Sequence, residues 1–321
     1  MKHGLLISFL LLLATACQYK ELCYDHNHTG EVSVRMDWTE HPEASPSGMT
    51  VLFYNTDAPE SEPIRYDFTG QDGGTAKLRE GNWQAACYNN DTEAIRYRGM
   101  GSVATLEAYT RPSSIAEGTK LQYTKGDMPR AKGAEGEEVI LEPDLLWGGA
   151  GTFFSVVANQ AQTTTIAPRE LVRDITITIR DVPNLQYTAG LGGSLTGLAG
   201  SVYVASGQLG ESHVTQAFEV QKADETTLVI HIHIFGHCPH AEEGIENEHQ
   251  LVIYAVLADG SQWYYTTDIT GQMHDEELNP PEDFHIEVEI EDIPIPKPIV
   301  NGSGFQPTID GWQGVEIEVG M

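Results

Sequence analysis

One stretch decides the fold: Arg173-Asp174-Ile175-Thr176-Ile177-Thr178-Ile179-Arg180, in which three isoleucines lie on one face and two threonines on the other. A period of two along the chain is typical of a strand with one buried face. Residues 284–291 repeat this alternation, and no segment of the second half carries a sustained apolar stripe of helical period. The sequence therefore predicts an all-β protein.

Further strands are expected on both sides of this stretch. Residues 31–38 place four apolar side chains on one face. Residues 251–257 and 262–267 predict a hairpin, because Asp259-Gly260 between two apolar runs is a strong turn signal. Other expected strands are residues 49–54, 64–68, 83–88, 139–141 and 202–205. This order of strands and turns suits antiparallel sandwiches.

Glycine-rich and polar stretches are expected to separate the strands. Residues 191–200 predict a loop or one helical turn, residues 124–138 a loop late in the first domain, and residues 143–150 a domain boundary. With 321 residues the chain is long enough for two domains. The expected division is a lipoprotein signal peptide (1–16), a tether (17–29), an N-terminal β-sandwich (30–149), a C-terminal β-sandwich (150–292), and a proline-rich linker with a terminal strand (293–321).

The terminal segment combines a stiff linker with a last strand. Ile293-Pro294-Ile295-Pro296-Lys297-Pro298 predicts an extended linker, since proline neither continues a helix nor donates regularly to a sheet. Beyond it, Val315, Ile317 and Val319 share one face of an alternating run. That apolar face must be buried, either in this protein's own sheet or in the sheet of a neighbour. These three residues are therefore candidates for a strand that contacts a partner.

The N-terminus predicts a lipid-anchored protein. The apolar run at residues 5–13 is too short to cross a hydrocarbon core, which needs roughly twenty residues, and is typical of a secretory signal. Small residues at 14–16 lead into Cys17, and this resembles the bacterial lipobox, in which the cysteine is acylated and becomes the new N-terminus. The alternative is an ordinary cleaved signal with a chance cysteine. On the lipid hypothesis, Cys17 attaches the chain to the outer membrane.

Charge excludes one class of partner. The chain has 47 Asp and Glu residues against 18 Lys and Arg residues, which gives a net charge of −29. Such a surface repels phosphate backbones and offers no polybasic run to anionic lipid head groups. We therefore expect no nucleic-acid partner, and we expect membrane contact through the lipid on Cys17.

The cysteines leave two alternatives open. If Cys17 carries lipid, Cys23, Cys87 and Cys238 remain, an odd number for an oxidising compartment. A disulfide between Cys23 and Cys87 would stabilise the fold by roughly 4 kcal/mol in the chain-entropy model. The other possibility is that all three are buried thiols, because sequence does not fix connectivity.

The densest group of potential metal ligands is His231-Ile232-His233-Ile234-Phe235-Gly236-His237-Cys238-Pro239-His240. On a strand, His231 and His233 point to the same side, so they could bind one metal ion with His237, Cys238 or His240 as third ligand. The simpler interpretation is a pair of outward histidines on a sandwich strand that ends at Gly236.

No motif indicates catalysis. The sequence contains no phosphate-binding glycine loop before a helix, no nucleophile elbow and no zinc-protease helix motif. The aromatic run Trp263-Tyr264-Tyr265 could line a sugar-binding face, although Tyr264 faces away from its neighbours on a strand. We therefore expect a protein that is not an enzyme and needs no cofactor.

Several motifs bring a family to mind: Lys20-Glu21-Leu22-Cys23-Tyr24-Asp25-His26, Gly48-Met49-Thr50-Val51, Cys87-Tyr88-Asn89-Asn90-Asp91-Thr92-Glu93, and Gly304-Phe305-Gln306-Pro307-Thr308 with Trp312. With them the chain resembles a family of Bacteroidales surface lipoproteins of uncharacterised function, similar to the fimbrillin and fimbrial-anchor group. The resemblance implies two consecutive transthyretin-like (Greek-key) β-sandwich domains and a role in cell adhesion within a fimbrium.

In that group, stalk subunits lose their lipid and first strand to an arginine-specific protease, and a donor strand from the next subunit fills the groove. Here Arg35 lies inside the expected first strand and Arg130 lies deep in the first domain, so no cleavage site stands at the expected place. This departure favours an anchor or accessory subunit that keeps its lipid and contacts fimbrial subunits by strand addition. Two alternatives stay open: a surface glycan-binding lipoprotein, and a metal-binding protein built on His231 and His233.

Overall fold

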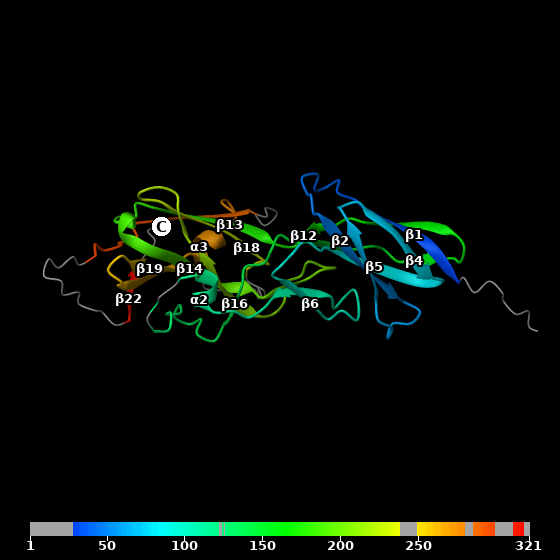
Figure 1. Ribbon diagram of the computed structural model, residues 1–321, viewed down its shortest axis with the longest axis horizontal. Coiled ribbons are helices and arrows are strands. Elements are labelled where there is room, and N and C mark those ends of the chain that lie inside the picture. The colour runs from blue at the N-terminus through cyan, green and yellow to red at the C-terminus, as the bar shows by residue number, and fades with distance from the viewer. Residues whose placement is uncertain are drawn as a thin grey trace, which may run out of the picture.

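The computed structural model describes residues 28–121, 124, 126–237, 249–279, 285–298 and 311–317. Within them the chain forms two β-sandwiches that lie end to end along the long axis of the molecule (Figure 1). The prediction of an all-β protein with two consecutive sandwiches is confirmed.

The first sandwich packs two sheets over one core. One sheet has the order β11-β1-β4, and the other has the order β12-β9-β5-β2-β3, with β10 pairing β5 beside β9. Alternate residues of each strand point to the same side, so Val34, Phe53 and Leu78 are buried between the sheets. The strands are β1 (Thr29–Met36), β2 (Gly48–Asn55), β3 (Ile64–Thr69), β4 (Gly73–Arg79), β5 (Gly81–Asn89), β9 (Trp147–Ala150), β10 (Phe154–Val156), β11 (Ala161–Ile166) and β12 (Arg169–Glu170).

The second sandwich repeats this strand order, with sheets β17-β18-β13-β21 and β22-β20-β19-β14-β16-β8. In each sandwich the first strand is parallel to a late strand, β1 to β11 and β13 to β21. In each, the following strand, β2 or β14, lies between two antiparallel neighbours. The elements are β13 (Arg173–Arg180), η1 (Leu185–Tyr187), β14 (Thr188–Ala199), β16 (His213–Glu219), β17 (Gln221–Lys222), β18 (Leu228–Ile234), β19 (Gln250–Leu257), β20 (Gln262–Asp268), α3 (Thr270–Met273), β21 (His285–Glu291) and β22 (Trp312–Ile317). The two sandwiches therefore share the transthyretin-like plan that the resemblance implies.

An insertion between β5 and β9 joins the two sandwiches. It contains β6 (Ile95–Arg98), β7 (Glu107–Thr110), α2 (Ile115–Thr119) and β8 (Glu138–Ile140). β6 and β7 form a small sheet with β15 (Ser201–Tyr203), whereas β8 pairs β16 of the second sandwich.

The strand pairing does not follow the expected domain boundary between residues 149 and 150. β10, β11 and β12 all follow residue 149, yet they pair within the first sandwich. The boundary that we propose therefore falls at Leu171 and Val172, between β12 and β13. Both residues are buried in an apolar cluster drawn from both sandwiches, which we call the joint core. Its other buried members are Leu52, Tyr54, Ala86, Tyr88, Ile95, Val103, Leu106, Ala108, Leu146, Ala199, Val202, Val204 and Phe235.

The expectation of a loop or helical turn at residues 191–200 is wrong, because most of this stretch belongs to β14. Its glycines make room for neighbours rather than break the strand. A Cβ on Gly192 would lie 2.5 Å from Thr119 Cβ of α2, which packs on this strand. Gly148 in β9 is similar, since its Cβ would lie 2.8 Å from Leu171 Cδ1. Residues 143–150 therefore end in a sheet strand instead of a linker.

Two irregular segments pack against the second sandwich. The loop expected at residues 124–138 lies on this sandwich, where the Tyr254 hydroxyl donates a hydrogen bond to the Pro129 carbonyl at 2.6 Å. The proline-rich segment after β21 buries Ile293 and Ile295 in the second core. The linker is extended as expected, but its isoleucines fix it to the sandwich.

Candidate functional site

His231 and His233 point outward from β18, as the period of two predicts, but they do not join His237. The exposed His231 contacts the Thr176 hydroxyl through Nδ1 at 3.0 Å. His233 lies between two carboxylates, with Nδ1 3.2 Å from Glu142 Oε1 and Nε2 3.0 Å from Asp174 Oδ1. The hydrogen bond with Glu142 raises the pKa of His233 against the opposing effect of burial. His233 is therefore a partner of carboxylates.

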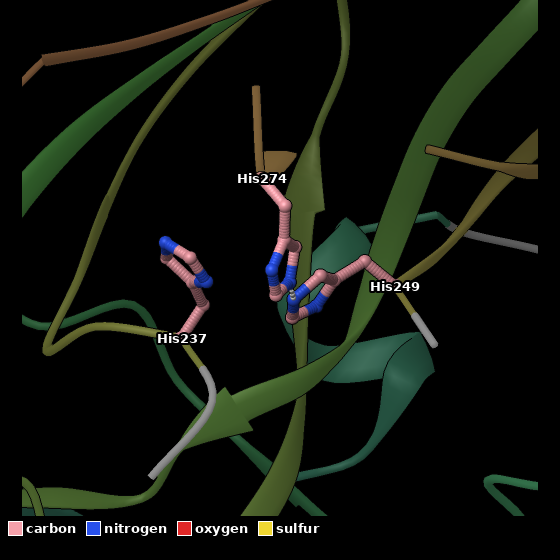
Figure 2. Close-up of side chains that lie close together, drawn as sticks. All are labelled: His237, His249 and His274. Atoms are coloured by element: carbon pink, nitrogen blue, oxygen red, sulfur yellow. Dashed lines mark hydrogen bonds between the residues drawn. The ribbon is translucent and has the colours of Figure 1, made fainter. Parts of the chain in front are cut away.

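His237 instead meets two histidines from distant parts of the sequence. Its ring centroid lies 5.3 Å from that of His249 and 5.2 Å from that of His274, and the His249–His274 separation is 5.3 Å. Figure 2 shows the three side chains close together. One ring nitrogen of each lies within 4.8 Å of those of the other two. We call His237, His249 and His274 the histidine triad.

Three elements bring the triad together. His237 follows β18 and forms an antiparallel bridge with Leu198 of β14. His249 immediately precedes β19, and His274 is the C-cap of α3. The start of α3 is fixed to His249, because the His249 amide donates to the Thr270 hydroxyl at 2.7 Å. The triad thus lies where the end of β18, the start of β19 and the end of α3 meet.

A bulge in β14 supplies the partner of His249. The register of β14 against β16 shifts between Leu195 and Leu198, and Gly197 adopts φ +73°. Thr196, within the bulge, places its carbonyl oxygen 3.1 Å from His249 Nδ1 and accepts a bond from the Gln250 amide through its hydroxyl. Since a carbonyl only accepts, Nδ1 carries the proton and Nε2 faces His274 at 3.2 Å.

Burial keeps two members of the triad neutral. It lowers the pKa of His237 to about 3 and that of His249 to about 4, and the neighbouring imidazoles act in the same direction. His249 is fully buried, His237 is half-buried and His274 is exposed. Neutral imidazole is the form that binds a metal ion.

Sequence reasoning found His237 but missed His249 and His274. The triad members stand 12 and 25 residues apart in sequence, which is no recognised ligand spacing. The run His231-Ile232-His233 was a stronger signal by spacing alone. Cys238 and His240, the other expected ligands, lie outside the described residues.

Only one cysteine of the predicted Cys23–Cys87 disulfide lies within the described residues. Cys87 is fully buried in the first core and forms no disulfide with another described residue, and burial raises the pKa of its thiol to about 12. Cys17 and Cys23 lie outside the described residues, so lipid attachment and pairing stay predictions.

The terminal strand lies in the chain's own sheet. β22 runs parallel to β20 at the edge of the sheet, with Val315 opposite Tyr265 and Ile317 opposite Thr267. Val315 and Ile317 are half-buried against the second core, whereas Val319 lies outside the described residues. The apolar face of this strand therefore packs against the chain's own core and needs no second subunit to cover it.

The free edge of β21 is covered by two side-chain amides. Gln272 in α3 bonds both the N–H and the C=O of Glu289, and Asn279 does the same for Glu287. A strand edge with satisfied backbone groups is a poor template for another strand. We call Gln272 and Asn279 the edge cap.

The aromatic run expected to offer a sugar-binding face is mostly internal. Tyr265 is buried in the second core, Trp263 packs against that core, and Tyr264 packs against the cluster around Tyr254. These residues therefore support packing rather than a glycan platform.

Residues 16–219 match a protein family described as Domain of unknown function (DUF5119). The match covers more than half of the chain. The chain belongs to this family. Within the described residues of this DUF5119 protein, no helix combines the length and apolar character needed to cross a membrane.

This DUF5119 chain is similar to several known proteins. It is 24% identical to a Bacteroides ovatus protein named "Putative fimbrium anchoring subunit Fim4B", over 97% of this chain and 96% of that protein. The crystal structure of a "putative adhesin" from Bacteroides ovatus is 21% identical, with a TM-score of 0.58 over 84% of this chain and 94% of that chain. The fimbrial anchor protein Mfa2 from Porphyromonas gingivalis is 13% identical, with a TM-score of 0.47 over 82% and 90%. The similarity to the Bacteroides ovatus protein over nearly the whole of both chains confirms the expected resemblance to the fimbrial-anchor group.

Proposed function

We propose that this DUF5119 protein is an anchoring or accessory subunit of a fimbrium at the cell surface. The observation that carries the proposal is the similarity to the fimbrium anchoring subunit of Bacteroides ovatus over nearly the whole of both chains. The two transthyretin-like sandwiches agree with it, since the fold is shared with an adhesin of the same species. The role is mechanical and involves no catalysis.

One end of the molecule would hold the outer membrane through a lipid on Cys17. The start of β1 lies at the outer end of the first sandwich (Figure 1). β1 lies between β11 and β4, and Arg35 pairs with Thr165 on one side and Gly73 on the other. Cleavage after Arg35 would need this central strand to open, which favours a subunit that keeps its lipid.

The other end would contact fimbrial subunits by strand addition. β22 lies at the opposite end of the molecule from β1 (Figure 1). It adds to the edge of β20 as a single strand, so a strand of another subunit could take the same place, or β22 could pair with the sheet of a neighbour. The second exchange would use the apolar face formed by Val315 and Ile317. The edge cap makes β21 the less suitable edge.

Crosslinking of the intact protein in its own cells tests the proposal. Mass spectrometry should find an acylated Cys17 and crosslinks to fimbrial subunits. If β22 pairs with the sheet of a neighbour, a Val315→Asp/Ile317→Asp variant should lose most of these crosslinks, whereas Glu316→Gln, on the exposed face of the same strand, should keep them. Recovery of a protein without fimbrial partners would exclude the anchoring role. A chain trimmed beyond Arg35 would indicate a stalk subunit.

A further inference from the structure

We propose that the histidine triad binds one divalent transition-metal ion, with Zn²⁺ as the first candidate. The site is independent of the fimbrial role and differs from the one expected around His231 and His233. Its members come from the end of β18, the start of β19 and the end of α3.

The geometry is close to that of a three-histidine site. With Zn–N bonds of about 2.0–2.1 Å, ligand nitrogens of a tetrahedral ion lie about 3.4 Å apart. His249 Nε2 and His274 Nε2 are 3.2 Å apart. All three candidate nitrogens lie within 4.8 Å of one another, and the half-buried His237 is the member that would move closer to complete the set.

The surroundings of His249 match those of a metal ligand. Metal-binding histidines commonly donate their second ring N–H to a backbone carbonyl or carboxylate, which fixes the tautomer and the ring plane. The Thr196 carbonyl has this role for His249 Nδ1. The β14 bulge that presents this carbonyl is thus an outer support for the site.

The burial of the triad also suits a metal site. Three imidazole rings are gathered in one place, with His249 buried and His237 half-buried. A metal ion needs neutral imidazoles, and it offsets the cost of removing them from water. Imidazole ligands favour Zn²⁺, Cu²⁺ or Ni²⁺ over Ca²⁺ and Mg²⁺, which prefer oxygen.

A bound ion would also hold the edge cap. His274 ends the helix that contains Gln272, and Gln272 bonds the free edge of β21. Coordination of His274 would fix α3 to β18 and β19. The exposed position of His274 leaves a fourth ligand position toward solvent, as in zinc sites with three protein ligands.

Titration of the full chain, produced without a histidine tag and stripped of metal, tests the proposal. Calorimetry with Zn²⁺ should give one equivalent per chain. Co²⁺ should produce the visible absorption of a tetrahedral nitrogen-ligated ion, which Zn²⁺ displaces. His274→Ala should lower the affinity by more than the roughly 10- to 100-fold that loss of an outer-shell contact costs. Because His274 is exposed, this variant should retain the fold.

His231→Ala is the matched control, since it removes an exposed histidine from β18 outside the triad. It should bind the metal as the unaltered chain does. Saturating Zn²⁺ should raise the midpoint of thermal unfolding of the unaltered chain and of His231→Ala, and leave that of His274→Ala unchanged. Absence of a stoichiometric site in the unaltered chain, or equal affinities for the unaltered chain and His274→Ala, would overturn the proposal. A loss in His231→Ala as large as in His274→Ala would also overturn it.

Discussion

Gln272 bonds Glu289 as a neighbouring strand would: its Nε2 donates to the Glu289 carbonyl at 2.7 Å, and its Oε1 accepts from the Glu289 amide at 2.8 Å. Asn279 repeats the arrangement at Glu287, with distances of 3.2 and 2.8 Å. Glu287 and Glu289 face solvent on β21, so acidic side chains flank the capped edge. Charge and satisfied backbone groups both discourage strand pairing there.

Removal of the edge cap should therefore promote self-association. A Gln272→Ala/Asn279→Ala variant exposes the N–H and C=O groups of two residues on β21, and we expect more dimer and aggregate than in the unaltered chain. Light scattering coupled to size-exclusion chromatography measures the change. Gln221→Ala, an exposed amide on β17, is the control and should behave as the unaltered chain. Equal association of all three proteins would show that the amides do not protect this edge.

The Cys87 thiol should be inert in the folded protein. It is fully buried, and its pKa is raised to about 12, so almost no thiolate exists at neutral pH. Iodoacetamide should label Cys87 only after denaturation, as measured by peptide mass spectrometry. The denaturation is done without a reductant, because a Cys23–Cys87 disulfide would leave Cys87 unlabelled until a reductant is added. The same experiment therefore separates the two alternatives for the cysteines.

Glu170 should make the protein less stable as the pH rises. Its pKa is raised to about 7, first by burial and then by Asp174. The folded state thus binds more protons than the unfolded state between about pH 4.5 and 7, and stability falls through that window. The full shift corresponds to about 3 kcal/mol, and because the group is half exposed we expect on the order of 1 kcal/mol.

Glu170→Gln should remove this pH dependence. The variant should be more stable than the unaltered chain at about pH 8 and equally stable at about pH 4, where the carboxyl is protonated in both states. Urea unfolding at each pH gives the comparison, and Glu211→Gln, an exposed glutamate, controls for the change in net charge. A difference that is the same at both pH values would contradict the assignment.

Truncation in the joint core should be costly. Leu171→Ala removes a side chain that is 4% exposed, and we expect a loss of about 2–4 kcal/mol in the free energy of unfolding. Leu145→Ala, at a leucine that is 41% exposed, should change stability by less than about 0.5 kcal/mol. Urea unfolding followed by tryptophan fluorescence measures both. Similar values for the two variants would mean that the joint core contributes little.

The sequence predicted several of the strands whose two faces differ. β1, β13, the β19–β20 hairpin and β21 each have one apolar and one polar side, or a turn of definite chemistry, so their period is visible in one dimension. β9 and β14 were missed because their glycines indicated a domain boundary and a loop or helical turn. The glycines at 148 and 192 leave room for Leu171 and Thr119. These two residues are distant in sequence, so the close packing is visible only in the folded chain.

The histidine triad illustrates the same limit at a site. His237 lies in the cluster that the sequence singled out, but His249 and His274 reach it through the pairing of β14 with β19 and the return of α3. Spacing in the chain favoured His231 and His233, which the structure turns toward Thr176 and toward two carboxylates. Likewise, the alternation around Val315 predicted a strand without naming the edge that it joins.

The buried connection at Leu171 and Val172 has a mechanical consequence. With both residues packed in the joint core, this connection cannot swing as a free hinge, and traction applied at one end of the molecule passes to the other through packed side chains. The traction enters each sandwich at the start of β1 or β13 and leaves after the parallel β11 or β21. Each of these parallel pairs is then loaded in shear, so that its hydrogen bonds share the force instead of opening one after another.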